Sequence, residues 1–182
     1  FGFRVHNEAA RFDNVKVVID GVKEPRLSAN FETENPFDGG QIVDIDGNKK
    51  LLVDASSEYF AFEKQEAAEP LDLHYSYAAD FQIAHDNMGL IFAAKDSRNF
   101  FMWAINTTGS SRPYLRRHIF INGSATGVAD IPLPAGFTAD SLKSAEHRLV
   151  IRVEDGKVIT SLDGATVDSY TDAAGQLTLG DF

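Results

Sequence analysis

The chain has 182 residues, a formal net charge of -10 and no cysteine. This length predicts one domain with a sizeable core. The absence of cysteine excludes disulfides, thiolate zinc sites and thiol chemistry. The acidic balance, with no block of lysine and arginine, argues against nucleic-acid partners and anionic membrane surfaces, because binding phosphate needs concentrated positive charge. No apolar run reaches the length of a membrane span, so no membrane insertion is expected.

Short apolar or alternating runs follow one another along the chain, as is typical of strands. The first two, residues 1–5 and 12–19, are separated by a predicted turn at 6–10. Further strands are expected at 29–32, 42–45, 50–53, 58–64, 73–83, 89–94, 100–105, 114–121, 147–153, 158–162, around Val167 and at 176–179. Residues 58–69 could instead form a short helix, although the alternation favours the strand to about Lys64. Residues 131–142, which include two prolines, are expected to be irregular.

Several of these runs are joined by Asp-Gly or Asn-Gly pairs, which favour tight hairpin turns. The turns stand at Asp46-Gly47, Asn122-Gly123, Asp155-Gly156 and Asp163-Gly164. Many short strands joined in this way, with no convincing helix, predict an all-β antiparallel sandwich or barrel.

The hairpin at residues 87–106 is the expected centre of the fold. Its two runs, 89–94 and 100–105, are apolar on both faces and flank a polar turn at 96–99. Such a hairpin belongs in the middle of a sheet that is covered on both sides. Trp103 shares a face with Phe101 and Ile105, so we expect it in the core.

The runs MGLIFAAKDSRNFFMWAIN, HRLVIRVEDGKVITSLDGATVDSYTD and GFRVHNEAARFDNVKV resemble concanavalin A-like (laminin G-like) jelly-roll domains. The nearest likeness is to those appended to bacterial secreted glycoside hydrolases such as α-L-rhamnosidases. The resemblance implies an antiparallel two-sheet jelly-roll sandwich. It also implies a bacterial protein that is secreted or at the cell surface, extracellular or periplasmic.

The order of the segments is circularly shifted relative to that family, in which the GFRV segment ends the domain. Within a single sandwich over 1–182, residues 1–21 should correspond to the family's C-terminal strands, 22–28 to a connector and 29–182 to the remainder. A circular permutation, a tandem repeat cut inside one copy and a remnant of a preceding copy all explain this order.

Catalytic glucan-cleaving members of this fold carry a Glu-x-Asp-x-x-Glu strand, because hydrolysis needs two flanking carboxyl groups. That spacing does not occur here, so no catalytic activity is expected of this chain, although its parent protein could be a glycoside hydrolase. A Ser-His-Asp triad stays open, since triads assemble in space.

The first hypothesis is a non-catalytic carbohydrate-binding or accessory module whose partner is a glycan or polysaccharide. The alternative is a structural repeat of an extracellular adhesin or filament, completed by strand exchange between neighbouring copies. An independent glycoside hydrolase ranks last.

Sugar sites combine aromatic faces with planar polar groups that bind hydroxyls directionally. The candidates lie at the ends of the central hairpin or two residues apart on one face of the next strand. They are Arg98, Asn99, Asn106, Tyr114, Arg116 and His118. In so acidic a chain, the alternative is that Arg116 and Arg117 only pair with neighbouring acids.

The resemblance also implies a structural Ca²⁺ at a sandwich edge, bound by carboxylate and carbonyl oxygens. The candidate ligands are Asp13 and Glu32. The alternative is that both are ordinary surface acids.

Overall fold

The structure, a computed structural model, describes residues 1–63, 74–108 and 110–175. This part of the chain forms 13 strands and one short helix. The strands are β1 (Gly2–Ile19), β2 (Leu27–Ala29), β3 (Gln41–Ile45), β4 (Asn48–Phe62), β5 (Tyr75–Ile83), β6 (Asn87–Asp96), β7 (Asn99–Asn106), β8 (Tyr114–Ile121), β9 (Ser124–Ala125), β10 (Ala129–Pro132), β11 (His147–Glu154), β12 (Lys157–Leu162) and β13 (Ala165–Thr171), and the helix is α1 (Ala139–Ser144).

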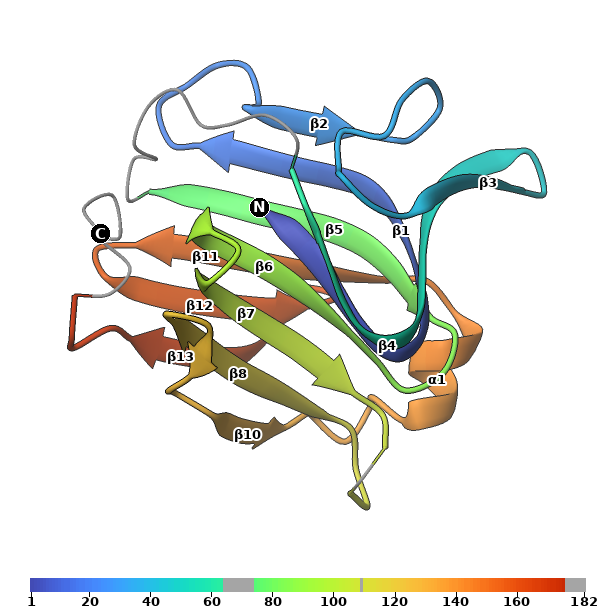
Figure 1. The fold of residues 1–182 in the computed structure, drawn as a ribbon. Coiled ribbons are helices and arrows are strands. Elements are labelled where there is room, and N and C mark those ends of the chain that lie inside the picture. Colours follow the sequence, from blue (N-terminus) through green and yellow to red (C-terminus); the bar gives the residue numbers. More distant parts are fainter. Residues whose placement is uncertain (64–73, 109, 176–182) are drawn as a thin grey trace.

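The strands form two antiparallel sheets packed as a sandwich, which confirms the predicted all-β jelly-roll class (Figure 1). We call one the front sheet; it contains β10, β8, β7, β6 and the first part of β1. The other, the back sheet, contains the second part of β1 and then β5, β11, β12 and β13. The central hairpin β6–β7 lies inside the front sheet and is buried on both faces, as predicted.

Strand β1 belongs to both sheets. The predicted turn at 6–10 is wrong, because the backbone stays in strand geometry and only shifts register between His6 and Glu8. Before the shift, β1 pairs with β6; from Ala10 onward, it pairs with β5. Strand β4 accompanies β1 on both sides of the shift. The residues predicted as two separate strands therefore form one strand that connects the layers.

The core lies between the sheets and is dominated by aromatic rings. Phe3 and Phe12, both from β1, stack with their ring centroids 4.0 Å apart. Trp103 of β7 is fully buried, and its ring meets that of Tyr170 on β13 edge-on at 5.8 Å. The predicted core position of Trp103 is confirmed, and its ring joins the front sheet to the back sheet.

Two local predictions are wrong. The stretch 131–142 is not irregular throughout, because it holds part of β10 and the start of α1, where Thr138 and Ser141 form a capping box. The strand expected at 29–32 is also misplaced. The observed strand, β2, ends at Ala29, because Phe31 shortly after it takes a left-handed φ of 58°. β2 thus begins inside the predicted connector 22–28, and the predicted strand 176–179 lies outside the described residues. Within the described part, no helix has the length and apolar character needed to cross a membrane.

Replacing Trp103 by alanine should lower the free energy of unfolding by about 3–5 kcal/mol, because it empties a fully buried site between the sheets. Urea denaturation of the folded protein measures this loss. The control is Val128→Ala, whose side chain is 55% exposed and should change stability by less than about 0.5 kcal/mol. Equal midpoints for the two variants would contradict the core assignment.

Candidate functional site

The outer face of the front sheet carries most of the predicted sugar-binding residues. Alternate residues of β8 pack into the core, so the others face outward. These are Tyr114, Arg116, His118 and Phe120, all half-buried. The shared face proposed for the first three is therefore present.

Neighbouring strands extend this face. Register along β7 places Asn106 opposite Tyr114 and Ala104 opposite Arg116. On β6, Asn87 lies opposite Asn106. Asn106 itself donates from its side-chain amide to the Ala104 carbonyl at 3.2 Å, which holds the side chain close to the sheet.

This outer face is concave. The rings of Phe60 on β4 and Phe120 on β8 meet edge-on with centroids 6.2 Å apart. Four strand spacings separate β4 from β8, or about 19 Å in a flat sheet. Rings on strands so far apart touch only where the sheet curls toward them.

Aromatic rings fill one end of the concave face. Phe100 stacks on Phe120 at 4.4 Å, and Phe62 meets Phe100 edge-on at 5.8 Å. The His118 ring lies parallel to Phe120 with centroids 5.9 Å apart. The phenylalanine rings pack with Ile91 and Met102 in a second apolar cluster, separate from the core between the sheets. His118 therefore marks the boundary between the aromatic end and the polar end.

Arg116 is the most firmly held group at the polar end. Its Nε and a terminal nitrogen donate to the two carboxylate oxygens of Asp130 on β10 at 2.5 and 2.6 Å. Its guanidinium also lies over the Tyr114 ring, 5.2 Å from the centroid. A fork bonded to a carboxylate and stacked on a ring has little freedom left to lose on binding a ligand.

A second arginine lies on the same face, two strands away from β7. Arg4 of β1 is 8% exposed and donates to the Asn87 side-chain oxygen at 3.0 Å. Between Arg4 and Arg116 stand only Gly89 and Ala104, whose register follows from the strand pairing. Both small residues are buried, so neighbouring side chains cover the middle of this row.

Arg98 and Asn99 are not part of this group. They lie at the opposite end of β7 from Asn106, about 24 Å away along an eight-residue strand. The Arg98 guanidinium donates to the Asn122 carbonyl at 2.8 Å, and the Asn99 side-chain oxygen accepts the Asn122 N–H at 2.9 Å. Both residues tie the β6–β7 turn to the turn after β8.

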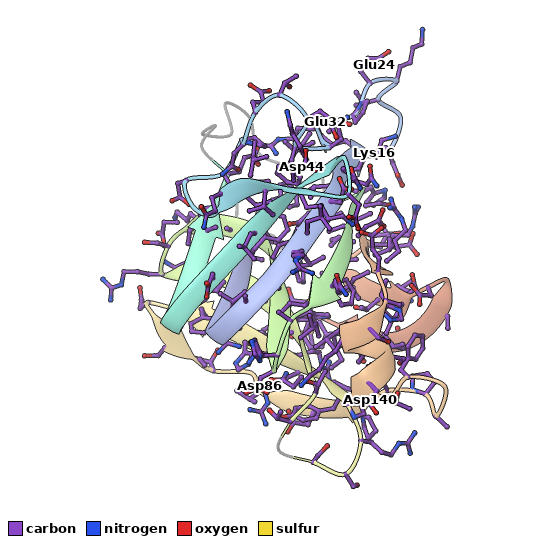
Figure 2. All side chains as sticks on the ribbon, turned by 90° about the vertical axis from the view of Figure 1, so that its right-hand side faces the viewer. Lys16, Glu24, Glu32, Asp44, Asp86 and Asp140 are labelled. Carbon is purple, nitrogen blue, oxygen red and sulfur yellow. The ribbon has the colours of Figure 1, made fainter. Side chains whose placement is uncertain are left out.

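Protein donors already bond both carboxylate oxygens of Asp13 and one of Glu32, the two predicted calcium ligands. Asp13 is buried and accepts from the Asn14 N–H at 2.7 Å and from the Asn48 amide at 3.1 Å. Glu32 lies exposed at the end of the molecule shown uppermost in Figure 2, and accepts from the Lys49 N–H at 3.3 Å. In the ranges that the structure describes, no group of three or more His, Cys, Asp or Glu side chains could hold a metal. Calcium binding stays a prediction.

One histidine pairs with an aspartate beside a serine. His147 Nδ1 lies 2.7 Å from Asp163, but its Nε2 faces the Ser141 backbone carbonyl at 2.9 Å. The Ser141 hydroxyl instead donates to the Thr138 carbonyl at 3.0 Å. This arrangement ties α1 to the back sheet and lacks the contact from nucleophile to base that a triad requires.

Sequence reasoning missed Asp130, Arg4 and Asn87 on the concave face. Arg4 was detectable, since it alternates with two buried residues of β1 and must face away from the core. Asp130 was signalled only by the expectation that Arg116 finds an acid. Asn87 opens the central hairpin and gave no signal of its own.

Comparisons with protein-family models, curated proteins and solved structures found no match to this chain.

The bond from Arg116 lowers the pKa of the Asp130 carboxyl below its ordinary value. An aspartate whose pKa is lowered by folding stabilises the folded state at pH values above its ordinary pKa. That contribution is lost as the pH falls through the lowered pKa. Arg116→Gln should therefore raise the pKa of Asp130 toward its ordinary value, as measured by carboxyl carbon NMR. Asp96, whose pKa is lowered chiefly by the Arg98 backbone N–H, should not change. An unchanged Asp130 would contradict the pairing.

Proposed function

We propose that this domain is a non-catalytic carbohydrate-binding module of a secreted bacterial glycoside hydrolase or surface protein. In this proposal, a glycan or polysaccharide lies on the concave face of the front sheet. Tyr114, Arg116 and His118 make the central contacts, and Asn106 lies beside them.

The observation that carries the proposal is the fixed fork of Arg116 between Tyr114 and Asp130. Sugar recognition needs a ring face for the apolar side of the pyranose and planar groups that bind hydroxyls in fixed directions. Arg116 covers one face of the Tyr114 ring, so in this proposal the other face of the ring meets the sugar, while Asp130 and Arg116 supply acceptors and donors. Because these groups hold one another before ligand arrives, binding costs little side-chain entropy.

Binding without catalysis is favoured by the state of Asp130. A general acid in glycoside hydrolysis needs a raised pKa, so that it is protonated near neutral pH. Hydrogen bonding to Arg116 lowers the pKa of Asp130 instead. The carboxylate that the described residues place beside Arg116 is therefore suited to accepting hydroxyl hydrogen bonds.

A glycan array on the isolated domain identifies the ligand, and calorimetry with Arg116→Ala tests the site. Loss of a charge-assisted hydrogen bond, worth about 1.5–3 kcal/mol, should weaken binding by about ten-fold or more. The melting temperature should hardly change, since the side chain is 35% exposed.

The matched control is Arg152→Ala. Arg152 lies on β11 of the back sheet and bonds two acids, Glu154 at 2.7 Å and Asp20 at 2.9 Å. The Arg152→Ala substitution thus removes the same charge and a comparable ion pair from the other side of the sandwich. Equal loss of glycan binding in both variants, or none in either, would refute the proposed face.

A further inference from the structure

The outer face of the back sheet carries a polar hollow of about 340 Å³. It lies where a register shift in β1 between Asp13 and Lys16 meets the edge strand β2 and the start of β11. Its polar lining comes from Asn14, Lys16, Ser28, Asn30 and Arg148. The volume falls within the range of small-molecule sites, about 300–1,000 Å³, but the lining is polar where most such sites are apolar.

The local shape follows from strained backbone at Asn14. This residue takes a left-handed φ of 45°, at the point where β1 shifts its pairing with β5. Beyond the shift, Lys16 stands opposite Ser28 on β2, so both side chains leave the sheet on the same side. Val15 and Val17 are buried on the inner side, which fixes Lys16 outward.

Positive charge in the hollow exceeds negative charge. The Asp80 carboxylate is divided between Arg148, which donates at 2.7 Å, and the Asn14 amide at 2.9 Å. Lys16 is exposed and makes no ion pair within the described residues. Glu32 and Asp44 lie at the same end of the molecule in Figure 2, yet neither is paired with Lys16. In a chain of net charge -10, one uncompensated cation beside three neutral polar groups is a local exception.

We propose that this hollow binds a small hydroxylated monoanion, such as a sugar acid, with its carboxylate at Lys16. Arg148 lines the same hollow and keeps donor nitrogens beyond the one that bonds Asp80. The Ser28 hydroxyl and the Asn30 amide supply the directional bonds that hydroxyl groups require. The site lies on the opposite side of the sandwich from Arg116 and does not rest on the function proposed for that face.

Amide NMR on the ¹⁵N-labelled protein tests this site with D-glucuronate as the probe. Glucuronate should shift the amides of Asn14, Ser28 and Asn30, with a dissociation constant on the order of 1 mM, as expected for an open polar site. Lys16→Gln should weaken binding by up to about five-fold, the upper value of one exposed ion pair. Lys157→Gln removes the same charge from β12, away from the hollow, and should leave binding unchanged.

Titrations with D-glucose and with sulfate test separately whether the hollow recognises the charge or the hydroxyl groups of the ligand. Glucose should cause much smaller shifts at these amides, and sulfate should bind more weakly than glucuronate. Equal shifts with glucose would show that the cation plays no part, and equal shifts with sulfate would reduce the site to charge alone; either result overturns the proposal. The absence of shifts at Asn14, Ser28 and Asn30 with glucuronate overturns it as well. The Arg116→Ala variant should still show the glucuronate-induced amide shifts. The result for the hollow is therefore independent of the result for the front-sheet site.

Discussion

The structure depends on one strand that pairs in two sheets. The backbone groups of β1 must bond β6 before the shift at His6–Glu8 and β5 after it, while β4 follows on the same side throughout. Buried backbone groups must be paired, so the point where β1 changes partner is also the point where the sheets diverge. The side chains of β1 also connect the two parts of the strand, because Phe3 before the shift and Phe12 after it stack on each other in the core.

This corner also shapes the concave face. Because β4 follows β1 into the front sheet, its residues Phe60 and Phe62 stand at the rim and lean across the face toward Phe100 and Phe120. The rings close one end of the face and bury Ile91 and Met102 beneath them. The end with Arg116 and Tyr114 keeps polar groups at the surface. The strand that connects the two sheets therefore also places the aromatic cluster at one end of this face.

Much of the fold was readable from the sequence because period-two alternation and Asp-Gly turns are local signals. β8 matches its predicted bounds of 114–121, and β6–β7 holds the predicted central position. The corner in β1 was not readable, because a register shift and a turn have the same polar sequence signature at 6–10. At the site, alternation grouped Tyr114, Arg116 and His118. The sequence also nominated Arg98 and Asn99, which lie at the other end of β7 from Asn106, because the two ends of a strand are close in the chain and far apart in space.

Arg116 and Arg117 show how alternation separates a possible binding group from a structural one. Both pair with an aspartate, as the alternative from the sequence anticipated. Arg116 faces outward to Asp130, whereas Arg117 faces inward and reaches Asp168 on β13 at 3.6 Å. The pKa values of the two aspartates shift in opposite directions. The hydrogen bond from Arg116 lowers the pKa of Asp130. Desolvation raises the pKa of Asp168, although the charge of Arg117 acts to lower it. Slipping β8 by one residue would exchange these roles and place Tyr114 in the core. Leu115 and Ile119, buried between the sheets, therefore hold β8 in the register on which the exposed pair of Arg116 and Asp130 depends.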